Sequence, residues 1–169
     1  MAISESRAAA AGTHFRVQYP NSRPRRIRII GLGEGGARIA QDIGARGLRE
    51  VEIIATGDYA KHHAEAMMKG LADDARDLHR QLAEADIIFM VAVSGDQVEF
   101  ARVVSRVAHE LGKLVTGVLI EAHRVSRVAA SPQDAATLDT LRAGADVLVI
   151  GSDESYLEEM LGALGAIEV

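Results

Sequence analysis

A glycine-rich turn between an apolar run and a helical pattern constrains the fold of this chain more than any other stretch. The turn lies in Arg26–Ala40, RIRIIGLGEGGARIA, where the apolar residues before the glycines are typical of a buried strand. Gly31, Gly33 and Gly36 have the G-x-G-x-x-G spacing of a phosphate-binding strand-to-helix turn. The first glycine permits a sharp turn, the second lets a ligand approach the backbone, and the third lets the helix pack closely on the strand.

The turn therefore predicts an anion site, because the N–H groups that open a helix are free and lie at its positive end. The alternative is a glycine-rich turn without a ligand; the order strand, glycines, helix favours ligand binding. Glu34 places a carboxylate inside the turn, which would repel a phosphate unless a cation intervened. The binding residues predicted here are Gly31, Gly33, Glu34, Gly35 and Gly36.

Five apolar runs alternate with amphipathic segments along the chain. The runs are Ile27–Ile30, Val51–Ala55, Asp86–Val93, Leu114–Ile120 and Asp146–Ile150. Strands separated by helices indicate right-handed crossovers, so the fold class predicted is α/β, a doubly wound parallel sheet of about five strands of the Rossmann type. With strands numbered along the chain, we expect the order 2-1-3-4-5 and a switch point between the first and third strands.

Length and composition limit the function. The 169 residues suit one domain, 26–169, and the formal net charge of −5 argues against nucleic-acid binding. The absence of cysteine excludes disulfides and thiolate metal sites. No apolar run reaches the roughly 18 residues of a membrane helix. We therefore expect a cytoplasmic protein without a transmembrane segment.

Residues 1–25 are predicted to form a flexible N-terminal extension, because they combine an alanine-rich stretch with several breakers of regular structure. Four arginines, Arg23, Arg25, Arg26 and Arg28, cluster at its end. A solvated tail is the favoured interpretation; a docking arm for an acidic partner or a membrane surface is the alternative.

Small polar residues follow three of the predicted strands: Thr56-Gly57-Asp58, Ser94-Gly95-Asp96 and Ser152-Asp153. Carboxyl ends of parallel strands share the sheet edge where ligands bind. Asp58, Ser94, Gly95 and Asp96 are therefore candidates for contacting ribose hydroxyls or a hydrated magnesium ion. The alternative is that such residues cap the following helix. Capping is preferred for Asp153, and both interpretations stay open for Ser94 and Asp96.

Residues 26–161 resemble the nucleotide-binding half of the tubulin/FtsZ superfamily, with the bacterial cell-division GTPase FtsZ as the nearest match. The resemblance rests on IRIIGLGEGGARIAQDIGARGLREVEIIATGD, on ADIIFMVAV with VVSRVAHELGKLV, and on LDTLRAGADVLVIGSDESYLEEML. It implies the fold stated above and a guanine nucleotide, GTP or GDP, at the glycine turn.

The chain departs from the family pattern where the family binds phosphates. The signature loop Gly-Gly-Gly-Thr-Gly-Thr-Gly is replaced by the shorter, acidic Ser94–Phe100, and of the family's Asn-Thr-Asp after the second strand only Asp58 is kept. The resemblance places the long central helix, the catalytic loop and the second domain beyond Val169. It therefore implies no self-contained GTP hydrolysis and no catalytic residue in this chain.

Three functions are weighed. The first is a degenerate, truncated, single-domain FtsZ-like protein that serves as a partner-binding or regulatory module, with weak, altered or lost guanine-nucleotide binding. The second is a Rossmann-type NAD(P)-binding domain. The third is a small metal-dependent enzyme with Glu34, Asp58 and Asp96 on the metal.

The last amphipathic segment predicts self-association. Its apolar residues span more than one stripe, so Leu161, Leu164 and Ile167 are expected to remain exposed after the helix docks. A homodimer is the predicted result, and another protein partner, such as a full-length FtsZ-like relative, is the alternative.

Overall fold

Five parallel strands alternate with five helices in the part of the chain that the structure, a computed structural model, describes: residues 25–56, 73–121 and 131–166. The strands are β1 (Ile27–Gly31), β2 (Val51–Ala55), β3 (Ile87–Val93), β4 (Val115–Ile120) and β5 (Val147–Gly151). The helices are α2 (Gly33–Gly44), α4 (Asp73–Glu84), α5 (Phe100–Glu110), α7 (Pro132–Gly144) and α8 (Ser155–Ala163). The sheet order is β2-β1-β3-β4-β5, which confirms the predicted topology.

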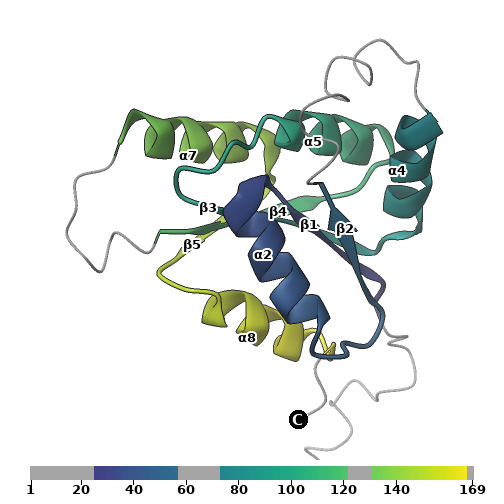
Figure 1. Cartoon of the computed structure of the whole chain (residues 1–169). Helices are drawn as coiled ribbons and strands as arrows, with labels where there is room; N and C mark the ends of the chain where they lie inside the picture. The colour runs from purple at the N-terminus through teal and green to yellow at the C-terminus, as the bar shows by residue number, and fades with distance from the viewer. Residues whose placement is uncertain (1–24, 57–72, 122–130, 167–169) are drawn as a thin grey trace, which may run out of the picture.

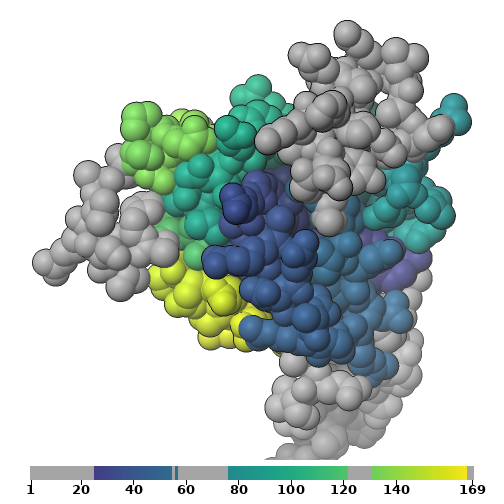
Figure 2. Space-filling model, in the orientation of Figure 1, coloured from purple at the N-terminus to yellow at the C-terminus, as the bar shows by residue number. Residues whose placement is uncertain are grey.

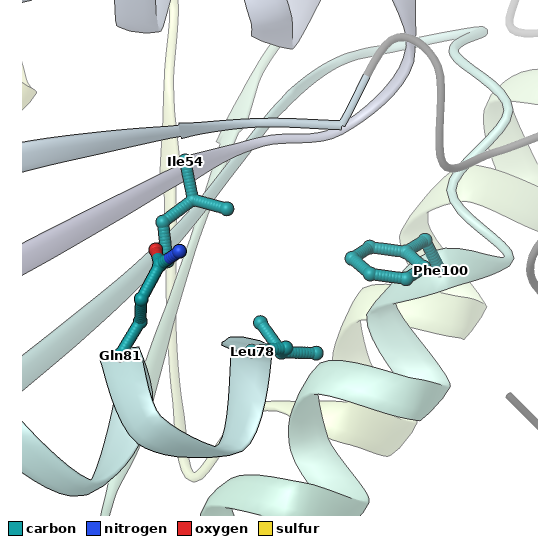
Figure 3. Close-up of a pocket in the computed structure, with 4 residues that line it drawn as sticks. All are labelled: Ile54, Leu78, Gln81 and Phe100. Carbon is teal, nitrogen blue, oxygen red and sulfur yellow. The ribbon is translucent and has the colours of Figure 1, made fainter. Parts of the chain in front are cut away.

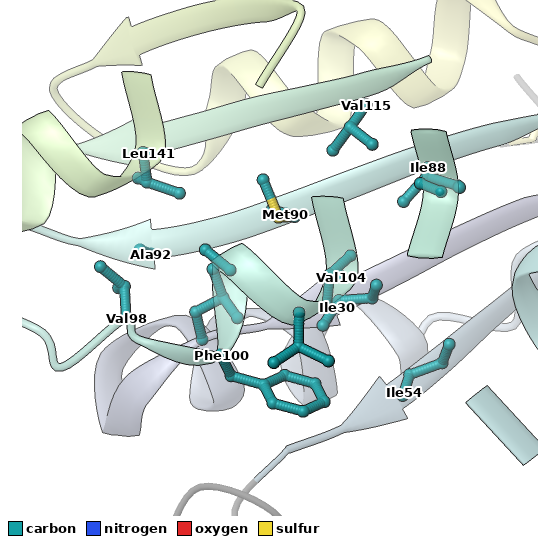
Figure 4. Close-up of a cluster of buried hydrophobic side chains, with 14 of the residues drawn as sticks. Ile30, Ile54, Ile88, Met90, Ala92, Val98, Phe100, Val104, Val115 and Leu141 are labelled. Carbon is teal, nitrogen blue, oxygen red and sulfur yellow. The ribbon is translucent and has the colours of Figure 1, made fainter. Parts of the chain in front are cut away.

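The helices cover both faces of this sheet, as a doubly wound fold requires. Helices α4, α5 and α7 lie on one side, and α2 and α8 on the other (Figure 1). On the first side Met90 and Ile30 of the sheet pack against helix residues such as Phe100 and Val104 (Figure 4). On the second side Ile39 and the other buried residues of α2 pack on β1 and β3.

A capping box sets the start of α7. The Ser131 hydroxyl accepts a hydrogen bond from the Asp134 N–H, and the Asp134 carboxylate accepts one from the Ser131 N–H. Pro132 then occupies the first turn, where its missing N–H has no cost. Capping rather than apolar periodicity therefore sets the start of this helix.

The arginines that enter the sheet are held by carboxylates and do not form a free basic patch. Arg28 is buried on β1, and its guanidinium lies 2.8 Å from the Glu52 carboxylate and 3.6 Å from that of Glu84. The Arg26 guanidinium lies 3.8 Å from the Asp86 carboxylate. Arg23 lies outside the described residues.

The expectation that Leu161 stays exposed is wrong. Leu157 and Leu161 lie one helical turn apart and are both fully buried against the sheet. Leu164 is half-buried and packs on the same cluster, since the chain turns back after α8 so that the Ala166 carbonyl accepts a hydrogen bond from the Arg49 N–H at 3.0 Å. Ile167 lies outside the described residues. The described part of α8 therefore leaves little of the predicted dimer surface.

None of the helices in the described ranges has the length and apolarity needed to cross a bilayer. Residues 1–24 and Asp58 lie outside the described residues.

Candidate functional site

The glycine turn has the geometry that its spacing predicts. β1 ends at Gly31, and α2 begins at Gly33, whose φ is +66° and so favours glycine. A Cβ on Gly36 would lie 2.1 Å from the Val91 carbonyl oxygen, so this glycine lets α2 pack directly on β3. Leu32 precedes the helix and has no side chain that can cap it. The first N–H groups of α2 therefore have no acceptor within the helix and need one from another part of the chain.

The carboxylate of Asp96 occupies these N–H groups. Its Oδ1 accepts a hydrogen bond from the Gly35 N–H at 3.0 Å, and its Oδ2 accepts one from the Gly36 N–H at 2.9 Å. The same Oδ2 accepts a third from the Val93 N–H at 2.8 Å. A Cβ on Gly33 would lie 2.6 Å from the Cβ of Asp96, so the approach that the second glycine permits is taken by this side chain. The chain supplies its own anion to the turn.

Asp96 thus caps a helix, as one interpretation had it, but the helix is α2 rather than the α5 that follows. α5 itself begins after Glu99, which makes no side-chain cap. Because Asp96 lies about 60 residues after the turn in sequence, a local pattern of caps does not reveal this contact.

Helix α7 holds the other side of the same loop. The backbone carbonyl of Asp96 accepts a hydrogen bond from the Thr137 hydroxyl at 2.7 Å and one from the Gln133 side-chain amide at 3.3 Å. The Ser94 hydroxyl donates to the Asp134 carboxylate at 2.8 Å. Gly95 between them has a φ of +88°, which lets the loop turn. The Ser94–Asp96 loop is therefore fixed to both α2 and α7.

A hollow of about 990 Å³ opens beside the turn. Carboxylates from Glu34, Asp96 and Glu99 line it, and Arg38 is the basic residue among its described lining residues. The hollow is thus acidic where a phosphate would have to enter. Figure 2 shows α2 in dark blue across the centre of this face, beside α8 in yellow. Arg46, two residues after α2, forms a 2.6 Å ion pair with Glu158 of α8.

In the described part of the chain, the polar residues that follow β2 and β5 make structural hydrogen bonds. Asp153 accepts a hydrogen bond from the Ser155 N–H, the first N–H of α8, at 2.9 Å, although the N-cap residue of the helix is Glu154. The Ser155 side chain and its N–H lower the pKa of Asp153 below its usual value. The Thr56 hydroxyl is buried and donates to the Gly31 carbonyl. Asp58 lies outside the described residues, and the residues within them form no group of three metal-ligating side chains.

A second cavity lies between β2, α4 and α5, lined by Ile54, Leu78, Gln81 and Phe100 (Figure 3). Its volume of about 10 Å³ is at the lower limit for one water molecule. It is a packing gap rather than a ligand site.

Sequence reasoning missed three residues of the site, Gln133, Asp134 and Thr137. They lie about 40 residues after the loop that they hold. The S-x-x-D spacing at Ser131–Asp134 is a signal for the start of α7, but nothing in it indicates which loop the helix contacts.

The fold and the strand-end loops define the class: a Rossmann-type α/β domain whose glycine turn is occupied by a side chain of its own. Comparison with solved structures shows that the fold is similar to that of FtsZ. An FtsZ W319Y mutant from M. jannaschii has a TM-score of 0.54 and 13% identity, over 96% of this chain and 57% of its own. An empty FtsZ dimer from M. jannaschii has a TM-score of 0.55 and 15% identity, over 88% of this chain and 49% of its own. The chain spans about half the length of these FtsZ chains. No protein-family model matches it.

Proposed function

We propose that this chain is a degenerate FtsZ-like domain that acts by binding a protein partner, with guanine-nucleotide binding weakened or lost and without GTP hydrolysis of its own. We place it in the cytoplasm, which its cysteine-free composition favours. The partner is a second copy of the chain or an FtsZ-like relative.

The observation that carries the proposal is the Asp96 carboxylate on the N–H groups of Gly35 and Gly36. A phosphate needs the same donors, so it has to displace a charged group that already makes three hydrogen bonds. Glu34 and Glu99 add repulsion at the entrance. The same obstruction applies to the pyrophosphate of NAD(P), which argues against the dinucleotide alternative. A metal site on Asp96 is disfavoured because both carboxylate oxygens accept backbone N–H groups.

Partner binding is supported by the fold. One of the similar structures is an empty FtsZ dimer, which supports a protein–protein contact as the role of a domain with this fold. The formal net charge of −5 disfavours nucleic acid as the partner.

Calorimetric titration of GDP, GTP and NADH, with and without magnesium, tests the nucleotide part. We expect no binding by the wild type at ligand concentrations up to about 1 mM, which corresponds to about −4 kcal/mol. Asp96→Gly combined with Glu99→Thr removes the internal anion and one repulsive charge and should gain affinity for GDP. Asp153→Gly is the matched control, because it removes a capping carboxylate from α8. A micromolar dissociation constant for the wild type would refute the proposal.

Light scattering over a concentration series tests the choice of partner. A mass above that of the monomer at high concentration supports self-association. A monomer at every concentration excludes it and leaves the FtsZ-like relative, which a pull-down with a purified full-length FtsZ then tests directly.

A further inference from the structure

Strand β5 lies at the edge of the sheet and lacks the usual protection of an edge strand. Among the described residues it pairs with β4 alone. Its sequence, VLVIG over Val147–Gly151, has neither a charge nor a proline, which are common means of keeping an edge from pairing with another chain. The Glu121 N–H donates to the Gly151 carbonyl at 2.8 Å, so alternation along β5 turns the N–H and C=O groups of Leu148 and Ile150 away from β4. These groups can pair with a further strand.

The exposed apolar side chains of the described residues gather around the same strand. Large apolar side chains are exposed at Leu114, Val147 and Tyr156. Because Thr116 pairs with Val147, alternation places Leu114 and Val147 on the face of the sheet that α8 covers further along β4. A Cβ on Gly151 would lie 2.9 Å from Cδ2 of Tyr156, so the aromatic ring lies over this glycine on the same face. Val147 and Tyr156 therefore lie at opposite ends of β5, on one face.

The two ends of β5 are complementary to each other. When two copies of this five-residue strand pair antiparallel in full register, Val149 lies opposite the partner's Val149. Val147 then lies opposite the partner's Gly151, where the missing side chain leaves room for it beside the ring of the partner's Tyr156. Pairs of aromatic and β-branched side chains across two strands stabilise a sheet. The same register places Leu148 opposite the partner's Ile150, and both residues have their backbone groups directed toward the other copy.

We propose that a second copy of this chain pairs with β5, antiparallel and about a two-fold axis at Val149. One continuous sheet then runs through the dimer, and the same surface is buried on both copies, as in the commonest kind of oligomer. The buried leucines of α8 pack with Val118 and Ile120 of β4, so this helix is set back from the edge and leaves it accessible. The inference rests on the proposed function, in which the domain binds a protein, and it selects the second copy from the two partners named there.

Disulfide trapping in the full chain tests the position of the axis, because the sequence has no cysteine of its own. In Val149→Cys the two equivalent Cα atoms would be about 4.5 Å apart, within the range of a disulfide. We expect mild oxidation to give a crosslinked dimer on non-reducing gels. Leu114→Cys is the control: this position is 74% exposed, but it would lie three strand spacings, or about 14 Å, from its counterpart. Equal crosslinking of the two variants, or no crosslink in Val149→Cys, would overturn the proposal.

Sedimentation over a concentration series tests the same surface without a covalent bond. Val147→Lys places an ammonium group beside the partner's Tyr156, where it loses water, and should raise the dimer dissociation constant by about tenfold or more. Ala83→Lys adds the same charge at an exposed position of α4 and should leave the constant unchanged.

The outcomes separate this inference from the proposed function. A dimer that both variants weaken equally, or that neither weakens, would overturn the β5 interface and leave self-association in place. A wild-type monomer at every concentration would overturn the choice of a second copy, and the proposed function would then depend on the FtsZ-like relative.

Discussion

The two ends of the sheet, where the strands finish and where they start, differ in how their exposed groups are covered. At the carboxyl end of β1 and β3, the N–H groups that open α2 are paired by Asp96 from within the same body. At the starting ends of β4 and β5, the described residues leave Leu114 and Val147 exposed beside an uncharged edge. At the end where ligands bind in this type of fold, the backbone donors are already paired by Asp96, and we call it the closed end. At the opposite end, apolar side chains are exposed, and we call it the open end. The two ends of the sheet therefore differ in which groups remain accessible: backbone N–H groups are paired at one, and apolar side chains are exposed at the other.

The largest loss of stability is expected at Gly36 of the closed end, where α2 packs directly on the backbone of β3. Gly36→Ala would put a Cβ 2.1 Å from the Val91 carbonyl oxygen, which cannot move without disrupting β3. We expect a loss of about 3 kcal/mol or more in the free energy of unfolding, measured by urea denaturation. The control is Gly162→Ala in α8, where a Cβ would meet nothing within 4 Å. This variant should be neutral or more stable by about 0.5 kcal/mol. Similar losses in both variants would show that the close approach at Gly36 is not limiting.

Removal of the internal anion should have the next largest effect. Asp96→Ala leaves the N–H groups of Gly35, Gly36 and Val93 without their acceptor, and should cost about 1.5–3 kcal/mol, the range for hydrogen bonds to a charged group. Glu99→Ala, in the same hollow, should cost less than about 0.5 kcal/mol. Urea denaturation of both variants measures the difference; equal stabilities would mean that the Asp96 contacts contribute little. Addition of phosphate to Asp96→Ala then shows whether an external anion restores stability.

A smaller effect should come from the connection to α7. Thr137→Val keeps the shape of a fully buried side chain but removes the hydroxyl that donates to the Asp96 carbonyl at 2.7 Å. We expect a loss of about 1 kcal/mol in thermal or urea unfolding. Thr140→Val on the same helix serves as the control and should change stability less. A larger loss at Thr140 would contradict the role given to Thr137.

The smallest effect is expected on the pH dependence of stability, through Asp146 at the open end. The Val115 N–H and then the His109 side chain hold the pKa of Asp146 below its usual value of 3.8. A carboxyl whose folded pKa is depressed stabilises the fold above its unfolded pKa, and this contribution disappears as pH falls through the folded pKa. Asp146→Asn should therefore flatten the acid side of the stability–pH curve in urea titrations below about pH 5. An unchanged acid limb would rule out this contribution.

The sequence predicts the fold better than it predicts the site. Alternating apolar runs and helices are sufficient for the strand order, because parallel crossovers leave few topologies. The glycine turn is also local, and its backbone geometry follows from Gly33 and Gly36. Asp96, Gly35 and Gly36 could be named as site residues, but not the contact between them, since Asp96 and the glycines lie on different strand-to-helix connections. A pattern that predicts an acidic group near an anion site cannot distinguish a cation ligand from an internal anion.

The expectation that Leu161 is exposed fails for a related reason. Leu161 follows Leu157 by four residues, so both face the sheet, and counting apolar residues on α8 overestimates its free surface. Leu114 and Val147 look like core residues in the sequence, because strand alternation does not show how far a helix extends over the strands it covers. Their exposure depends on the length and position of α8, which the apolar period alone does not fix.

Asp96 competes with any external anion for the N–H groups of Gly35 and Gly36, and it does so from within the same chain. This attachment raises the concentration at which a free ligand can replace it. A group held on the same chain acts at an effective concentration, which is already about millimolar for short flexible linkers and rises when the geometry is fixed. Here the loop is fixed on both sides, by α2 and by α7. A diffusing phosphate at millimolar concentration therefore competes with a carboxylate that never leaves the vicinity. On the proposed function, the state of this domain does not follow the ratio of GTP to GDP around it.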